Sequence, residues 1–89
     1  MRNCGNRIYE NMNQDKVNAI LKALTDHGSL VSGGNPWNVD TRKFGVLLLG
    51  EWDENASKLS ITVTDADWFV PQEKIWESID SLMQVVRKL

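Results

Sequence analysis

Apolar residues recur along the chain with two different spacings, which divide it into helical and extended segments. Between residues 13 and 27 they recur every three or four positions, as on one face of a helix. These positions are Val17, Ile20, Leu21 and Leu24. Gly28 follows the stripe and suits the left-handed conformation that ends many helices. We therefore predict a helix over residues 13–27, with Asn11 or Asn13 as its N-terminal cap.

A second helical pattern begins at Pro71, because proline is favoured in the first turn of a helix. Its apolar positions are spaced 4, 3, 4 and 3 residues apart, at Ile75, Ile79, Leu82, Val86 and Leu89. Trp76 and Met83 widen this stripe to one side. The spacing is typical of the broad buried face of a globular helix, and equally of the seam of a short coiled coil.

Residues 44–65 read as a hairpin of two strands. The second strand alternates apolar and hydroxyl residues, which is the period of a half-buried strand. The first strand is apolar on both faces, with Phe44, Val46 and Leu48 on one face and Leu47 and Leu49 on the other. Helices packed on the first face leave Leu47 and Leu49 on the opposite side of the sheet.

The element order is helix, short segments, two strands, helix. It predicts a small two-layer α+β domain with two helices on one face of an antiparallel sheet. We expect residues 11–89 to form this single domain and residues 1–10 to be a flexible N-terminal tail. Leu30-Val31 and Trp37-Val39 are short enough to be either minor strands or core plugs.

The cover over Leu47 and Leu49 bears on whether the protein works alone. One solution is internal: residues 29–39 fold over that face or add a strand. The other is a partner, most simply a second copy related by a two-fold axis. The two-faced strand and the coiled-coil spacing of the last helix together favour a homodimer.

Length and composition describe an ordinary globular domain. The 89 residues are 42% hydrophobic and 25% charged, with a net charge of -2 and scattered basic residues. Nucleic-acid binding is not expected, because it needs a basic stripe. No apolar run approaches the ~18 residues of a membrane span, and the N-terminus lacks the apolar core of a signal peptide. One cysteine, Cys4, provides no disulfide framework, so we expect a cytoplasmic protein.

Aromatic residues are the strongest candidates for a binding surface. Trp37, Trp52 and Trp68 fall in a loop or at strand ends, where indoles pack on the core edge or act as ligand platforms. Together with Leu47 and Leu49, they form the predicted interface or ligand-binding set, with Trp68 at its rim. A second hypothesis is a pocket between sheet and helices. It is lined by Trp52, Trp68 and Trp76, with Asp65 or Asp67 as its polar group.

Catalytic and metal-binding motifs provide no candidates. His27 is the only histidine, so it has no second ligand or triad partner of its kind. Neither a metal nor a cofactor is predicted. The leading interpretation is a non-catalytic binding or protein-interaction module acting as a homodimer. One alternative is a small-molecule-binding protein or minor enzyme with the tryptophan-lined pocket. Another is an accessory or inhibitor protein of a mobile element or phage.

Overall fold

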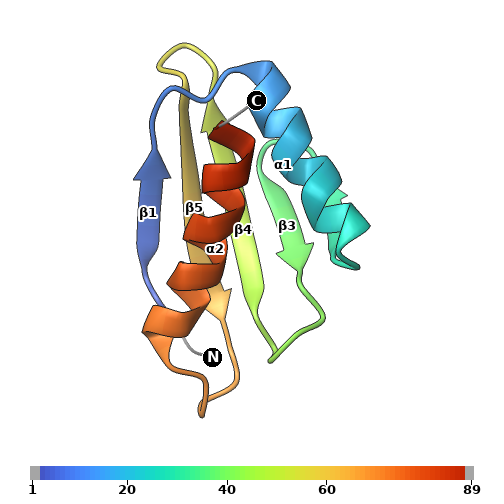
Figure 1. Ribbon diagram of the computed structural model, residues 1–89, viewed down its shortest axis with the longest axis vertical. Helices are drawn as coiled ribbons and strands as arrows, with labels where there is room; N and C mark the ends of the chain where they lie inside the picture. The colour runs from blue at the N-terminus through green and yellow to red at the C-terminus, as the bar shows by residue number, and fades with distance from the viewer. Residues whose placement is uncertain (1–2, 88–89) are drawn as a thin grey trace.

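The computed structural model describes residues 3–87 and shows two helices on one face of a five-stranded antiparallel sheet (Figure 1). In chain order the elements are β1 (Asn6–Tyr9), α1 (Gln14–Asp26), β2 (Leu30–Gly33), β3 (Trp37–Asp40), β4 (Leu47–Asp53), β5 (Lys58–Asp65) and α2 (Gln72–Arg87). The strand order across the sheet is β1-β5-β4-β3-β2. The predicted α+β class, with both helices on the same face, is confirmed.

Local signals set both ends of α1 and the start of α2 as predicted. The side chain of Asn13 accepts a hydrogen bond from the backbone N–H of Lys16 (2.9 Å), which caps α1. Gly28 has φ +91° and ends the helix. The carbonyl oxygen of Pro71 accepts a hydrogen bond from the backbone N–H of Lys74 (3.1 Å), so α2 begins directly after the proline.

The core lies between the helices and the sheet. On β5, the alternating residues Leu59, Ile61 and Val63 are buried. The buried residues of α2 are Ile75, Trp76, Ile79, Met83 and Val86. Trp76 and Met83 therefore belong to one broad core-facing stripe, as in an ordinary globular helix. Leu89, the last position of the predicted seam, lies outside the described residues.

The N-terminal segment differs from the expected flexible tail. Residues 6–9 form β1, an edge strand that pairs with β5 through partners such as Ile8 and Ser60. Cys4 is almost completely buried, and its carbonyl oxygen accepts hydrogen bonds from Trp76 Nε1 (2.8 Å) and Gln72 Nε2 (2.7 Å). The segment is too short and polar to show a strand pattern, and the residues with which it pairs lie 50 or more positions further along the chain.

Residues 29–39 do not fold over Leu47 and Leu49. They form β2 and β3, which extend the sheet at the far side of β4. The side-chain amide of Asn35 donates to the carbonyl oxygen of Trp52 (2.9 Å) and accepts from its backbone N–H (2.9 Å). Asn35 lies just before β3, so its side chain extends the hydrogen bonding between β3 and β4 past the first residue of β3. It thereby anchors the turn between β2 and β3 to β4.

Phe44 is not a core residue of the hairpin. It lies in the connection before β4 with φ +55°, and 63% of its surface is exposed. Val46 and Leu48 are buried as predicted. A positive φ is rare for a bulky residue, so the chain turns sharply at this point and carries the ring out of the core.

A polar network holds β1 against α2. Asp80 accepts hydrogen bonds from the guanidinium of Arg7 (2.6 Å) and from the hydroxyl of Tyr9 (2.8 Å). The hydrogen bond from Tyr9 is the largest influence that lowers the pKa of Asp80, and the bond from Arg7 adds to it. Burial, with the bond to Asp80, raises the pKa of Tyr9 to about 12. The network stabilises an edge strand of only four residues.

We expect Asp80→Asn to lower the free energy of unfolding at pH 7 and to flatten its decline in acid. The folded-state pKa of Asp80 lies below its unfolded value of about 4. Its stabilisation is therefore complete above that value and is lost as pH falls through the lowered pKa. Urea unfolding between about pH 7 and pH 2 measures this effect. The control Glu54→Gln removes an exposed carboxylate. Equal acid profiles for Asp80→Asn and the wild type would contradict the role of the network.

Candidate functional site

An open apolar groove separates the two helices. The helices lie close together near one end of the sheet and diverge toward the other end (Figure 1). The space between them is a cavity of about 710 Å³ that opens to solvent. Its floor is formed by Val46, Leu48 and Ile61, and its walls include Ile20 and Leu24 of α1 and Leu82 and Val85 of α2. We call this cavity the interhelical groove.

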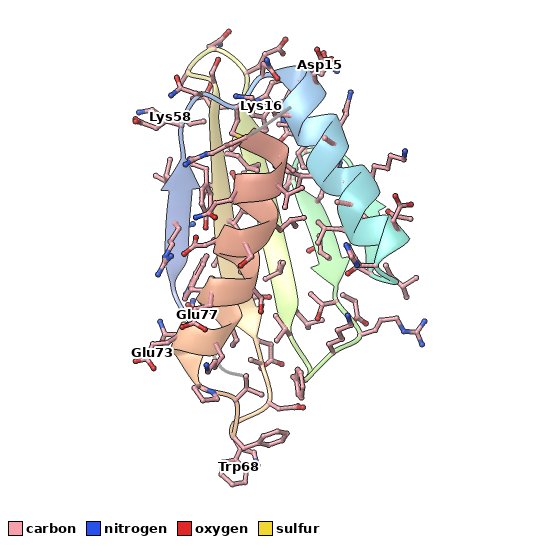
Figure 2. All side chains as sticks on the ribbon, in the orientation of Figure 1. Asp15, Lys16, Lys58, Trp68, Glu73 and Glu77 are labelled. Atoms are coloured by element: carbon pink, nitrogen blue, oxygen red, sulfur yellow. The ribbon has the colours of Figure 1, made fainter. Side chains whose placement is uncertain are left out.

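Three exposed aromatic side chains lie at the wide end of the groove. Phe44 and Phe69 line it and remain 63% and 59% exposed. Trp68 is 86% exposed and packs edge-on against Phe69, with 5.9 Å between the ring centroids. Figure 2 shows Trp68 projecting from the end of the molecule. We call these three residues, Phe44, Trp68 and Phe69, the aromatic lip. Burial of their large apolar rings against a partner would be favourable.

A contact between two loops holds the residues of the aromatic lip in place. The backbone N–H of Asp67 donates to the carbonyl oxygen of Phe44 (2.9 Å), which links the β3–β4 connection to the segment before α2. Gly45 has φ +64°, and a side chain at this position would collide with the carboxylate of Asp67. The close approach of the two loops therefore depends on a glycine.

The ionisable side chains that line the groove are all basic. They are His27 at the end of α1, Lys43 in the β3–β4 connection and Lys74 in the first turn of α2. Lys74 also lies 3.5 Å from the carboxylate of Glu77, and both side chains are largely exposed. Figure 2 shows Glu73 and Glu77 on the side of α2 that faces away from α1. Lys43 and Lys74 thus place positive charge in the lining of the wide end, while the nearest carboxylates, Asp67 and Glu77, lie outside the lining.

The predicted interface residues lie on two faces rather than one. Trp37 is half-buried beside α1. Trp52 is also half-buried, and its indole N–H donates to the carbonyl oxygen of Met12 (2.9 Å). Leu47 and Leu49 point to the opposite face of the sheet, because they alternate with the buried Leu48. Trp68 lies apart from all four, at the aromatic lip.

No helix covers the second face of the sheet within residues 3–87 (Figure 1). Leu47 and Leu49 are half-buried there by neighbouring side chains. Leu30 and Ile8 occupy the same face on the two edge strands and are 56% and 60% exposed. This open sheet face also carries hydroxyl side chains of β5, Ser60, Thr62 and Thr64. It is therefore less apolar than the groove.

The structure does not bring together the residues of the predicted tryptophan-lined pocket. The side chain of Trp76 is buried against the sheet, and none of the three tryptophans lines the interhelical groove. Asp65 lies opposite Leu47 at the end of β5, and Asp67 packs against Gly45. A cavity between sheet and helices exists, but its lining contains two phenylalanines and no tryptophan.

Sequence reasoning missed Phe44, Phe69 and Val85 as surface residues. Phe44 read as a strand residue on the buried face. Val85 lies one position beside the apolar stripe of α2 and is 66% exposed. The clearest signal is Trp68-Phe69-Val70, an uninterrupted apolar run in a loop directly before Pro71. Apolar rings in a short connection are candidates for a contact surface.

None of the helices within residues 3–87 is long and apolar enough to cross a membrane. The same residues contain no group of three or more acidic, histidine or cysteine side chains arranged to hold a metal ion. Comparison of the chain with protein-family models, curated proteins and solved structures returned no significant match. The geometry of the groove and of the open sheet face therefore carries the functional assignment.

We expect Gly45→Ala to loosen the aromatic lip and to lower the free energy of unfolding by roughly 1–3 kcal/mol, because the new side chain combines left-handed strain with a clash at Asp67. Backbone chemical shifts of Phe44 and Trp68 should move together. The control Gly34→Ala meets no atom within 4 Å and should change stability by less than about 0.5 kcal/mol. A Gly45→Ala variant with wild-type stability and unchanged lip resonances would contradict the proposed coupling of the two loops.

Proposed function

We propose that this protein is a non-catalytic protein-interaction module, and that its docking surface is the interhelical groove with the aromatic lip. The exposure of the lip carries this proposal. Aromatic side chains have about 150–250 Å² each to bury, and all three rings of the lip are more than half exposed. They adjoin an apolar cavity, so the exposed surface is contiguous rather than scattered. Such patches mark interaction sites more often than ordinary surface.

A small-molecule ligand is the second candidate for the groove. Its volume of about 710 Å³ lies within the range of about 300–1,000 Å³ for ligand sites, and its lining is mostly apolar with a few polar groups. A ligand confined to the cavity would nevertheless leave Trp68 in water, because this ring does not line the groove. A protein partner would cover both surfaces, so we favour a protein.

The polar network between β1 and α2 is a structural network rather than a catalytic site. Raised or lowered pKa values occur at Arg7, Tyr9 and Asp80, where they arise from a network between β1 and α2. These residues do not line the interhelical groove. Catalytic groups usually combine a perturbed pKa with a position in a cleft, and this network lacks the cleft.

Self-association through the open sheet face is a further part of the proposal. Leu47 and Leu49 occupy its centre, and Leu30 and Ile8 add exposed apolar surface at the edges. A second copy related by a two-fold axis would bury these residues against themselves. The self-associating face and the groove lie on opposite sides of the sheet, so a homodimer would present two grooves.

Replacing two exposed groove residues should abolish partner binding without unfolding the protein. We expect Phe69→Ser/Val85→Ser to weaken binding at least tenfold, because exposed apolar anchors contribute most of the energy of such interfaces. Stability should change by less than about 1 kcal/mol. Partners are captured from the producing cells, identified, purified and titrated. Gln84→Ser is the control, since it changes an exposed residue of α2 that lines neither the groove nor the open sheet face. Equal affinity of both variants for the purified partner would contradict the proposal.

The homodimer is tested by light scattering across a dilution series. We expect a dimer for the wild type and a folded monomer for Leu49→Glu. Leu49 is preferred to Leu47 because its cross-strand neighbours are Asn38 and Thr62, whereas Leu47 pairs with Asp40 and Asp65. Gln84→Glu adds the same charge at an exposed position of α2 and should remain dimeric. A wild type that is monomeric at every concentration would rule out the homodimer.

A further inference from the structure

We infer that the occupant of the interhelical groove is an amphipathic helix of a partner protein that carries acidic residues beside its apolar stripe. This inference rests on the proposed function and specifies the partner's chemistry. It draws on three features of the groove: the paired backbone of its floor, the length and small side chains of its walls, and the sign of its charges.

The floor of the groove favours a helix over an extended segment. Leu48 of β4 and Ile61 of β5 lie in strands that are paired on both sides, β4 with β3 and β5, and β5 with β4 and β1. Their backbone groups are therefore engaged, and no open strand edge faces the groove. An extended peptide would bury backbone N–H and carbonyl groups without partners, which is costly. A helix satisfies these groups internally.

The walls accommodate about three helical turns. Groove-lining residues of α2 extend from Lys74 to Val85, roughly 16 Å at 1.5 Å per residue. Ala23 on α1 and Ser78 and Ser81 on α2 are small, so a third helix can approach closely between the two. Its apolar residues at positions i, i+3, i+4 and i+7 would reach the aliphatic floor, which is the usual mode of helix-in-groove recognition.

The charged side chains of the groove indicate which residues flank the apolar stripe of the partner helix. Although the whole protein has a net charge of -2, the ionisable side chains lining the groove are His27, Lys43 and Lys74. The ion pair between Lys74 and Glu77 is exposed and therefore weak, so Lys74 can turn to a new partner. Carboxylates beside the apolar stripe of the incoming helix would complement this wide end, and basic flanks would be repelled.

Two other occupants fit these observations less well. A second copy docked groove to groove by a two-fold axis would bring Lys43 and Lys74 into an interface that already contains the same residues, so like charges would meet. A small amphiphile would leave Trp68, which is 86% exposed, in water. A helix that leaves the groove at its wide end can cover this ring.

Selection from a displayed library of helical 14-residue peptides tests the inference directly, because it needs no identified partner. The full chain is the target, and peptides that also bind Phe69→Ser/Val85→Ser are removed. We expect the retained helices to be enriched in Asp and Glu beside the apolar stripe. Replacing those acids by Gln or Asn should weaken binding about five- to tenfold at low salt and much less at 1 M salt. Selection against Lys43→Glu/Lys74→Glu should instead enrich Lys and Arg.

Failure of this inference alone and failure of the proposed function give different outcomes. Groove-dependent helices with no acidic bias, or a bias unchanged by Lys43→Glu/Lys74→Glu, would overturn the acidic partner while the groove remained a docking surface. The absence of any groove-dependent peptide would overturn both. Palmitate is titrated as a separate probe. If palmitate bound more tightly than every selected peptide, the groove would belong to a small amphiphile and the inference would fail.

Discussion

Adjacent strands of a sheet are rotated relative to one another by about 20–25°, and helices packed on different strands inherit that rotation. Here α1 covers the β3 side of the sheet and α2 covers the β5 side, so the two helices diverge along their length (Figure 1). They close the core where they approach and leave it open where they separate. The groove, its apolar floor and the loops that carry the aromatic lip all lie at the open end.

The sheet offers two surfaces of different chemistry because only one of its faces is covered. The helix side combines an aliphatic cavity with aromatic rings and basic side chains. The open side combines Leu47 and Leu49 with a row of hydroxyl side chains. The five-stranded sheet thus separates two surfaces. The helix side is suited to a foreign partner, and the open side is suited to self-association. The short edge strands β1 and β2 limit unwanted pairing at its borders.

Elements with strong local signals were predicted well. The first helix was predicted to within one residue at each end, because a periodic stripe, an asparagine cap and a glycine stop agree with one another. The positions of the aspartates and tryptophans in the predicted binding site were predicted less accurately. Trp52 was predicted as a possible ligand platform and Trp76 as part of the alternative tryptophan-lined pocket, yet both direct their indole N–H groups to backbone carbonyls. Whether an indole faces the core or the solvent depends on contacts with residues distant in sequence. The periodicity of apolar residues carries no information about those contacts.

The sequence by itself determined the α+β class, the two helices, the central hairpin and the presence of apolar residues on both faces of its first strand. Only the tertiary structure decided that residues 6–9 form an edge strand, that residues 30–40 widen the sheet, and that Phe44 leaves the core. The physical reason is the same in each case. Helices and hairpins depend on neighbours a few residues away. An edge strand, a sharp turn and a groove between helices depend on partners that only the folded chain brings together.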